Sequence, residues 1–144
     1  MKLKNNKGYV GVDVTIALMV LVILIPTITA MTFNINKTSN VIKRKTQAVS
    51  ITSNIMENAK IVFMEEEGLE NEEYIDRILS KTNELYEIDV EDNDILTIEN
   101  TMYKMDVEIE DKDNEEVKNV KATVTYKSGN NEESISFNTN FAMN

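Results

Sequence analysis

Carboxylates are the side chains through which this sequence could do chemistry, because it contains no Cys and no His. Their lack excludes thiolate zinc sites, cysteine catalysis and a Ser-His-Asp triad. One acidic turn, residues 111–116, resembles a calcium loop, but it lacks the Gly and the final Glu that such a loop requires. No pair of acids stands out as an acid–base couple. We therefore expect no enzymatic activity, no metal site and no cofactor. A second acidic group, which we also expect to be a solvated loop, contains Asp89, Glu91, Asp92 and Asp94.

One carboxylate, Asp13, differs from the others because it precedes a long apolar segment. Residues 14–36 carry no charge, and a bilayer core requires about 20 apolar residues in a helix. Residues 16–25 show no polar face, unlike a soluble core helix. An ionised carboxylate deep in a bilayer costs about 2.5–3.5 kcal/mol, so Asp13 predicts a contact with a partner. The residues assigned to the transmembrane segment include Val14, Ile16, Leu18, Leu21, Leu24, Pro26 and Phe33, and Pro26 predicts a kink.

The charge changes sign along the 144 residues. Residues 1–60 carry eight basic and two acidic side chains, whereas residues 61–144 carry seven basic and 23 acidic ones, for a total of −10. A change of this size indicates two segments with different surroundings. Three lysines precede the apolar segment, Lys2, Lys4 and Lys7, and they favour a cytoplasmic N-terminus. Four basic residues follow it, Lys37, Lys43, Arg44 and Lys45, so charge counting alone leaves the orientation open. The acidic total argues against a direct nucleic-acid partner.

Residues 7–13, which read KGYVGVD, resemble the cleavage site of type IV prepilins and pseudopilins. In that family a short basic leader ends in Gly, an aromatic residue follows, and the fifth residue after the cut is acidic. Gly8, Tyr9 and Asp13 match these positions. The resemblance covers about the first 60 residues and is greatest to V-type minor pilins and I-type pseudopilins. It implies a leader over 1–8, a transmembrane and filament-core helix over 9–36, and an outer domain over 37–144.

The resemblance also implies a function and its partners. A prepilin peptidase is expected to cut after Gly8 and to methylate the new amine of Tyr9. Asp13 would neutralise that amine on a neighbouring subunit and set the axial register, since a charge buried without a partner is expensive. The chain would be a structural minor pilin of a type IV pilus or of a related secretion or DNA-uptake machine. Its partners would be other pilin subunits, the membrane and the assembly platform. It would lie in the cytoplasmic membrane before assembly and at the cell surface afterwards.

Other interpretations of the apolar segment remain open. It also fits a secretory signal peptide cut near Ala30, or a plain signal anchor. In the anchor case the protein would be a single-pass, membrane-anchored binding module that is not processed, and its acidic domain would present an adhesive or cation-binding surface.

The segment that follows is amphipathic, and it predicts one long helix from about residue 10 to about residue 66. Two rows of apolar residues recur every seven positions, and they form a wide stripe on one face. A coiled coil would also have such rows, but the width of the stripe favours packing against a sheet. The two rows are Val41, Ala48, Ile55 and Val62, and Ile42, Val49, Met56 and Phe63.

The C-terminal part predicts a short helix over 71–84, and after it the apolar pattern changes to a period of two. Such alternation is typical of antiparallel strands with one wet and one dry face. The predicted fold class is therefore α+β, with a sheet of about five strands packed on the outer half of the long helix. The five strands are predicted over 86–91, 96–99, 103–110, 120–127 and 135–141.

Overall fold

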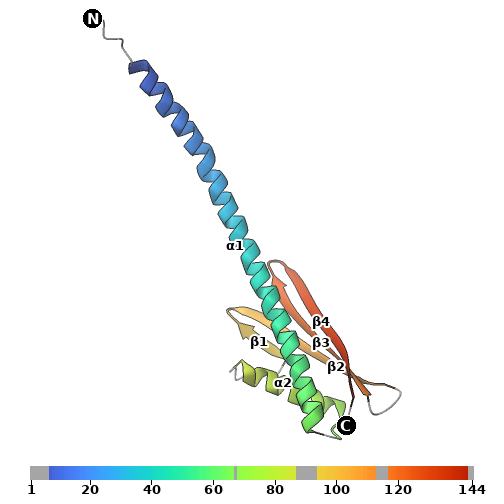
Figure 1. Ribbon diagram of the computed structural model, residues 1–144. Coiled ribbons are helices and arrows are strands. Elements are labelled where there is room, and N and C mark those ends of the chain that lie inside the picture. Colours follow the sequence, from blue (N-terminus) through green and yellow to red (C-terminus); the bar gives the residue numbers. More distant parts are fainter. Residues whose placement is uncertain (1–6, 67, 87–93, 113–116, 143–144) are drawn as a thin grey trace, which may run out of the picture. The chain divides into compact units, whose positions relative to one another are not determined.

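The computed structural model describes residues 7–66, 68–86, 94–112 and 117–142, with side chains from residue 11 onward. It confirms the α+β fold class (Figure 1). The chain divides into two units, residues 1–40 and 41–144, and each is described by itself. The elements are helices α1 (Lys7–Glu65) and α2 (Asn71–Leu85), and strands β1 (Ile95–Ile98), β2 (Thr101–Asp111), β3 (Val117–Ser128) and β4 (Asn131–Ala142).

The strands form one antiparallel meander in the order β1-β2-β3-β4 (Figure 1). Glu99 and Asn100 connect β1 to β2 with φ angles of 48° and 62°. Positive φ at both central residues matches the two-residue hairpin turns whose twist suits the flanking strands. The described residues contain four strands, one fewer than the predicted count of about five. Alternation begins at Tyr86, but this residue ends α2, and residues 87–93 lie outside the described part of the chain.

Within the second unit, α1 buries one face against α2 and the sheet. Ala48, Ile55 and Val62 are fully buried, which confirms most of the first predicted row. This packing is the predicted helix-on-sheet arrangement and not a coiled-coil seam. The other buried core residues come from all of these elements except β4, and they include Ile51, Ala59, Tyr74, Ile78, Leu96, Tyr103, Met105, Val107, Val120, Ala122, Val124 and Tyr126.

The second predicted row on α1 is only partly buried. Ile42 is 59% exposed and Val49 is 38% exposed, whereas Phe63 at the far end of the row is 3% exposed. A straight helix turns by about 20° per heptad relative to a seven-residue repeat. The row therefore rotates from solvent into the core along the helix, so the part of the predicted stripe at Ile42 and Val49 is not buried.

Candidate functional site

The apolar segment of α1 has no protein cover within its own unit. It is long and apolar enough to cross a membrane by length and composition, and none of its most apolar window is buried. Of the predicted transmembrane side chains, Leu24 is 47% exposed and Phe33 is 72% exposed. Val14, Ile16, Leu18 and Leu21 fall between these values. So large an apolar surface requires an apolar environment, which fits a membrane anchor.

The hydroxyls of four threonines within this segment are satisfied by the helix itself. Thr27, Thr29 and Thr32 each donate a hydrogen bond to the carbonyl oxygen four residues earlier, over 2.8–2.9 Å, and Thr15 does the same over 2.8 Å. Hydroxyls bonded in this way need no water, which suits a hydrocarbon environment. Pro26 lies inside α1, and the helix continues through it.

The predicted processing residues fall at the start of α1. Gly8 and Tyr9 lie within its bounds, although the side chain of Tyr9 is outside the described part of the chain. Asp13 is exposed, one helical turn beyond Tyr9. Residues four apart lie on the same helix face. This spacing places Tyr9 and Asp13 on one face of α1.

The predicted acidic clusters do not form a cation site among the described residues. Residues 87–93 and 113–116, which hold most of their carboxylates, are outside the described part of the chain. Asp111 instead pairs with Lys118 over 2.8 Å and accepts a hydrogen bond from Asn71 over 3.1 Å. The hydrogen bond from Lys118, followed by the one from Asn71, lowers the pKa of Asp111.

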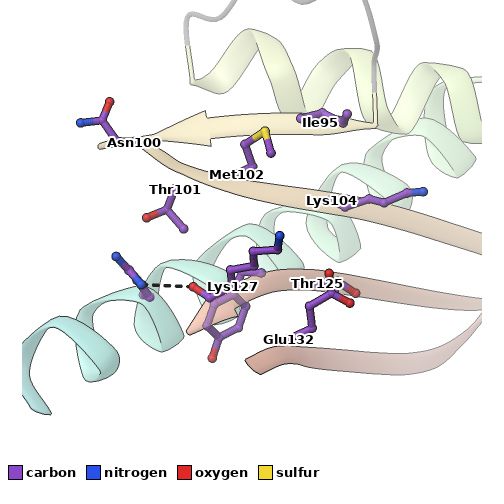
Figure 2. Close-up of a pocket in the computed structure, with 10 residues that line it drawn as sticks. Ile95, Asn100, Thr101, Met102, Lys104, Thr125, Lys127 and Glu132 are labelled. Atoms are coloured by element: carbon purple, nitrogen blue, oxygen red, sulfur yellow. Dashed lines mark hydrogen bonds between the residues drawn. The ribbon is translucent and has the colours of Figure 1, made fainter. Parts of the chain in front are cut away.

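A hollow of about 440 Å³ opens beside the strands of the sheet, and three of the ten residues that line it are cations (Figure 2). Arg44, Lys104 and Lys127 contribute three positive charges, and Glu132 contributes one negative charge. Arg44 Nη1 donates to the carbonyl oxygen of Lys127 over 3.2 Å. Residues 41–144 as a whole carry 11 basic and 24 acidic side chains, a balance of −13. The hollow therefore reverses the local charge and favours an anionic group.

Sequence reasoning missed this cationic hollow. Arg44 and Lys127 are 83 positions apart in the sequence, and no local pattern connects them. The chain matches no known protein family, and no curated protein or solved structure is significantly similar to it.

Proposed function

We propose that this protein is a minor pilin or pseudopilin, a structural subunit of a type IV pilus or of a related secretion or DNA-uptake filament. The observation that carries the proposal is the apolar helical segment that the chain leaves uncovered. A membrane covers such a surface before assembly, and packing against identical segments covers it in a filament. The pilin-like residues Gly8, Tyr9 and Asp13 at the start of the same helix support this burial, first in a membrane and then in a filament. The proposal includes no catalytic step.

The proposed assembly contact joins two charges. Cleavage after Gly8 creates an amine at Tyr9, which the processing peptidase also methylates. Asp13 lies one turn along the helix and neutralises the amine of a neighbouring subunit. A paired charge offsets much of its desolvation cost, so subunits in the correct axial register are favoured.

The proposal also sets the location and the partners of the chain. Before assembly the protein is a single-pass protein of the cytoplasmic membrane with its N-terminus inside. After assembly it lies at the cell surface, where the acidic unit of residues 41–144 faces the solvent. Its partners are other pilin subunits, the prepilin peptidase, the membrane and the assembly platform.

Determination of the mature N-terminus tests the proposal. The full chain is co-expressed with a prepilin peptidase, and its N-terminal peptide is identified by mass spectrometry. We expect the peptide to begin at a methylated Tyr9. The Gly8→Glu variant should retain the leader, because the bulky acid blocks the cut. A wild-type chain that keeps residues 1–8, or that is cut near Ala30, would refute the proposal.

A second candidate function is favoured by the cationic hollow. In this alternative the chain stays uncut in the membrane as a binding module, and Arg44, Lys104 and Lys127 receive an anionic ligand. Cell fractionation separates the two functions. A pilin subunit is recovered in filaments sheared from the surface, whereas a permanent anchor remains entirely with the membrane. Recovery only in the membrane, with the leader intact, would favour the binding module.

A further inference from the structure

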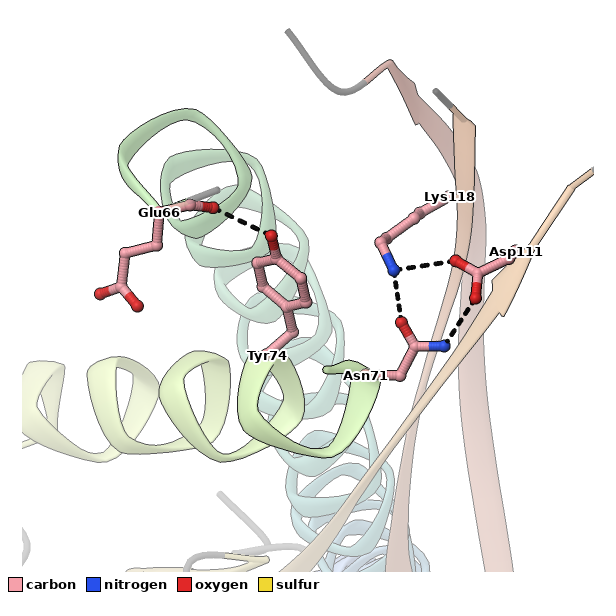
Figure 3. Close-up of polar contacts among 5 residues, drawn as sticks. All are labelled: Glu66, Asn71, Tyr74, Asp111 and Lys118. Carbon is pink, nitrogen blue, oxygen red and sulfur yellow. Dashed lines mark hydrogen bonds and ion pairs between the residues drawn. The ribbon is translucent and has the colours of Figure 1, made fainter. Parts of the chain in front are cut away.

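Three polar side chains from three different elements meet in a closed triangle in the second unit (Figure 3). Lys118 on β3 donates from Nζ to Oδ1 of Asn71 over 2.5 Å, and to Oδ1 of Asp111 over 2.8 Å. Asn71, the first residue of α2, donates from Nδ2 to Oδ2 of Asp111 over 3.1 Å. Asp111 on β2 therefore accepts one hydrogen bond at each carboxylate oxygen, from the amine at Oδ1 and from the amide nitrogen at Oδ2.

The lysine of this triangle is nearly buried. Lys118 is 9% exposed, although lysines are almost never buried. Its Nζ lies 5.2 Å from the centre of the Tyr74 ring, and Phe141 is its cross-strand partner on β4. Phe63 completes the aromatic wall, with ring centres 4.8 Å from Tyr74 and 5.6 Å from Phe141. The rings restrict the lysine side chain and hold its amine against the amide.

The amine lies within reach of the amide carbon. Nζ of Lys118 is 2.5 Å from Oδ1 of Asn71. A C=O bond of about 1.2 Å places the amide carbon no farther than about 3.7 Å from Nζ. Near-attack geometries have reacting atoms about 3–3.5 Å apart, so a small adjustment brings the pair to a reactive distance.

We propose that Lys118 and Asn71 form an intramolecular isopeptide bond, with Asp111 as the proton carrier. Oδ1 of Asp111 accepts a proton from the Lys118 ammonium, and the free amine attacks Cγ of Asn71. The new Nζ–Cγ bond replaces the Cγ–Nδ2 bond. Oδ2 of Asp111, already hydrogen-bonded to Nδ2, passes this proton to the leaving nitrogen, which departs as ammonia. Nζ loses a second proton as the secondary amide forms, and the ammonia takes up that proton to become an ammonium ion. One lysine ammonium and one amide thus become one secondary amide and one ammonium ion, with no oxidant or other reactant.

The isopeptide bond would join α2 and β3 covalently, where a side-chain hydrogen bond now connects them. Asn71 and Lys118 are 47 positions apart, so the link closes a long loop between α2 and β3. Closing a long loop restricts the unfolded chain, as a disulfide does. The sequence has no Cys, and the isopeptide bond would supply the covalent tie that a disulfide gives other small domains.

Peptide mass spectrometry of the purified full chain tests the bond. Trypsin should release residues 61–77 and 113–121 as one linked peptide. Its mass should equal that of the two parts less about 17 Da, the mass of one ammonia. Trypsin does not cut after an acylated lysine, so residues 113–118 should not appear alone. Because Asp111 starts as a carboxylate paired with an ammonium, the protein is followed over days after purification.

Matched variants identify the reacting groups. Lys118→Arg keeps the positive charge but removes the amine nucleophile, and Asp111→Asn removes the proton carrier, so both should abolish the linked peptide. Lys121→Arg, three residues along the same strand, changes a lysine that pairs with Glu108 and should leave the link intact. If aged wild-type protein releases peptide 113–118 and an unlinked peptide 61–77, the triangle is a hydrogen-bonded tie only and the proposal is overturned. This result would not bear on cleavage at Gly8.

Discussion

The phenol of Tyr103 donates a hydrogen bond to Oε1 of Gln47 over 2.7 Å, and this bond ties β2 to α1 across 56 positions of sequence. Tyr103 is fully buried, and its ring lies 5.8 Å from that of Tyr126. Two similar bonds tie α1 to the α2 region: Asn54 donates to the hydroxyl of Tyr86, and Asn58 donates to the hydroxyl of Thr82. Polar contacts thus flank the apolar face of α1 and orient it over the sheet.

Removal of the Tyr103 hydroxyl should destabilise the second unit modestly. Tyr103→Phe keeps the buried ring and loses one neutral hydrogen bond, which is worth about 1 kcal/mol. Chemical denaturation of the full chain measures this difference. A double-mutant cycle with Gln47→Ala isolates the pair, and a coupling energy near zero would show that the bond adds nothing to stability.

Truncation of two isoleucines on α1 should change the free energy of unfolding by very different amounts. Ile55 is fully buried, so Ile55→Ala should lower the free energy of unfolding by about 2–5 kcal/mol. Ile42 lies at the exposed start of the second row, so Ile42→Ala should change the free energy by no more than about 0.5 kcal/mol. The same denaturation measurement compares the two variants. Equal losses would contradict the rotation of that row out of the core.

Alkaline titration should show that Tyr103 and Tyr126 resist ionisation in the folded chain. Burial, followed by the hydrogen bond to Glu133, raises the pKa of Tyr126 to about 12, and burial also raises the pKa of Tyr103. A raised pKa means that the neutral phenol is favoured in the folded state. The stability it contributes is therefore complete below about pH 10, the ordinary tyrosine value, and is lost as the pH rises towards about 12.

Tyrosinate absorbance provides the measurement for this titration. Between these two pH values the folded chain should show less tyrosinate than the chain unfolded in guanidinium. Tyr126→Phe should remove part of that difference. Identical titration curves for the folded and unfolded chains would rule out the shift.

Asp13 should matter for assembly and not for processing. In Asp13→Ala the mature amine has no carboxylate partner, and leaving one member of a buried pair alone is costly. Incorporation into sheared filaments should therefore fall by about tenfold or more, while the mature N-terminus remains at Tyr9. Asp13→Glu keeps the charge and should restore most of the incorporation. Wild-type incorporation of Asp13→Ala would exclude a register role.

Local patterns predicted most of the elements to within a few residues. The helix expected over 71–84 is Asn71–Leu85, and the strand expected over 103–110 is Thr101–Asp111. Such patterns succeed because one-sided burial leaves a period in the sequence that does not depend on distant residues. At 86–91 the structure describes only Tyr86, which ends α2 and does not begin a strand; the rest of that predicted strand lies outside the described residues.

The sequence by itself determined the uncovered apolar segment, the acidic character of the second unit and the alternation of the strands, because each depends on residues adjacent along the chain. Only the tertiary structure decided which side chains meet. It brought Arg44 to the backbone of Lys127, and Lys118 to Asn71 and Asp111. These groups come from different elements, so strand register and the packing of α1 and α2 on the sheet set their distances. Neither feature leaves a local signal in the order of the residues.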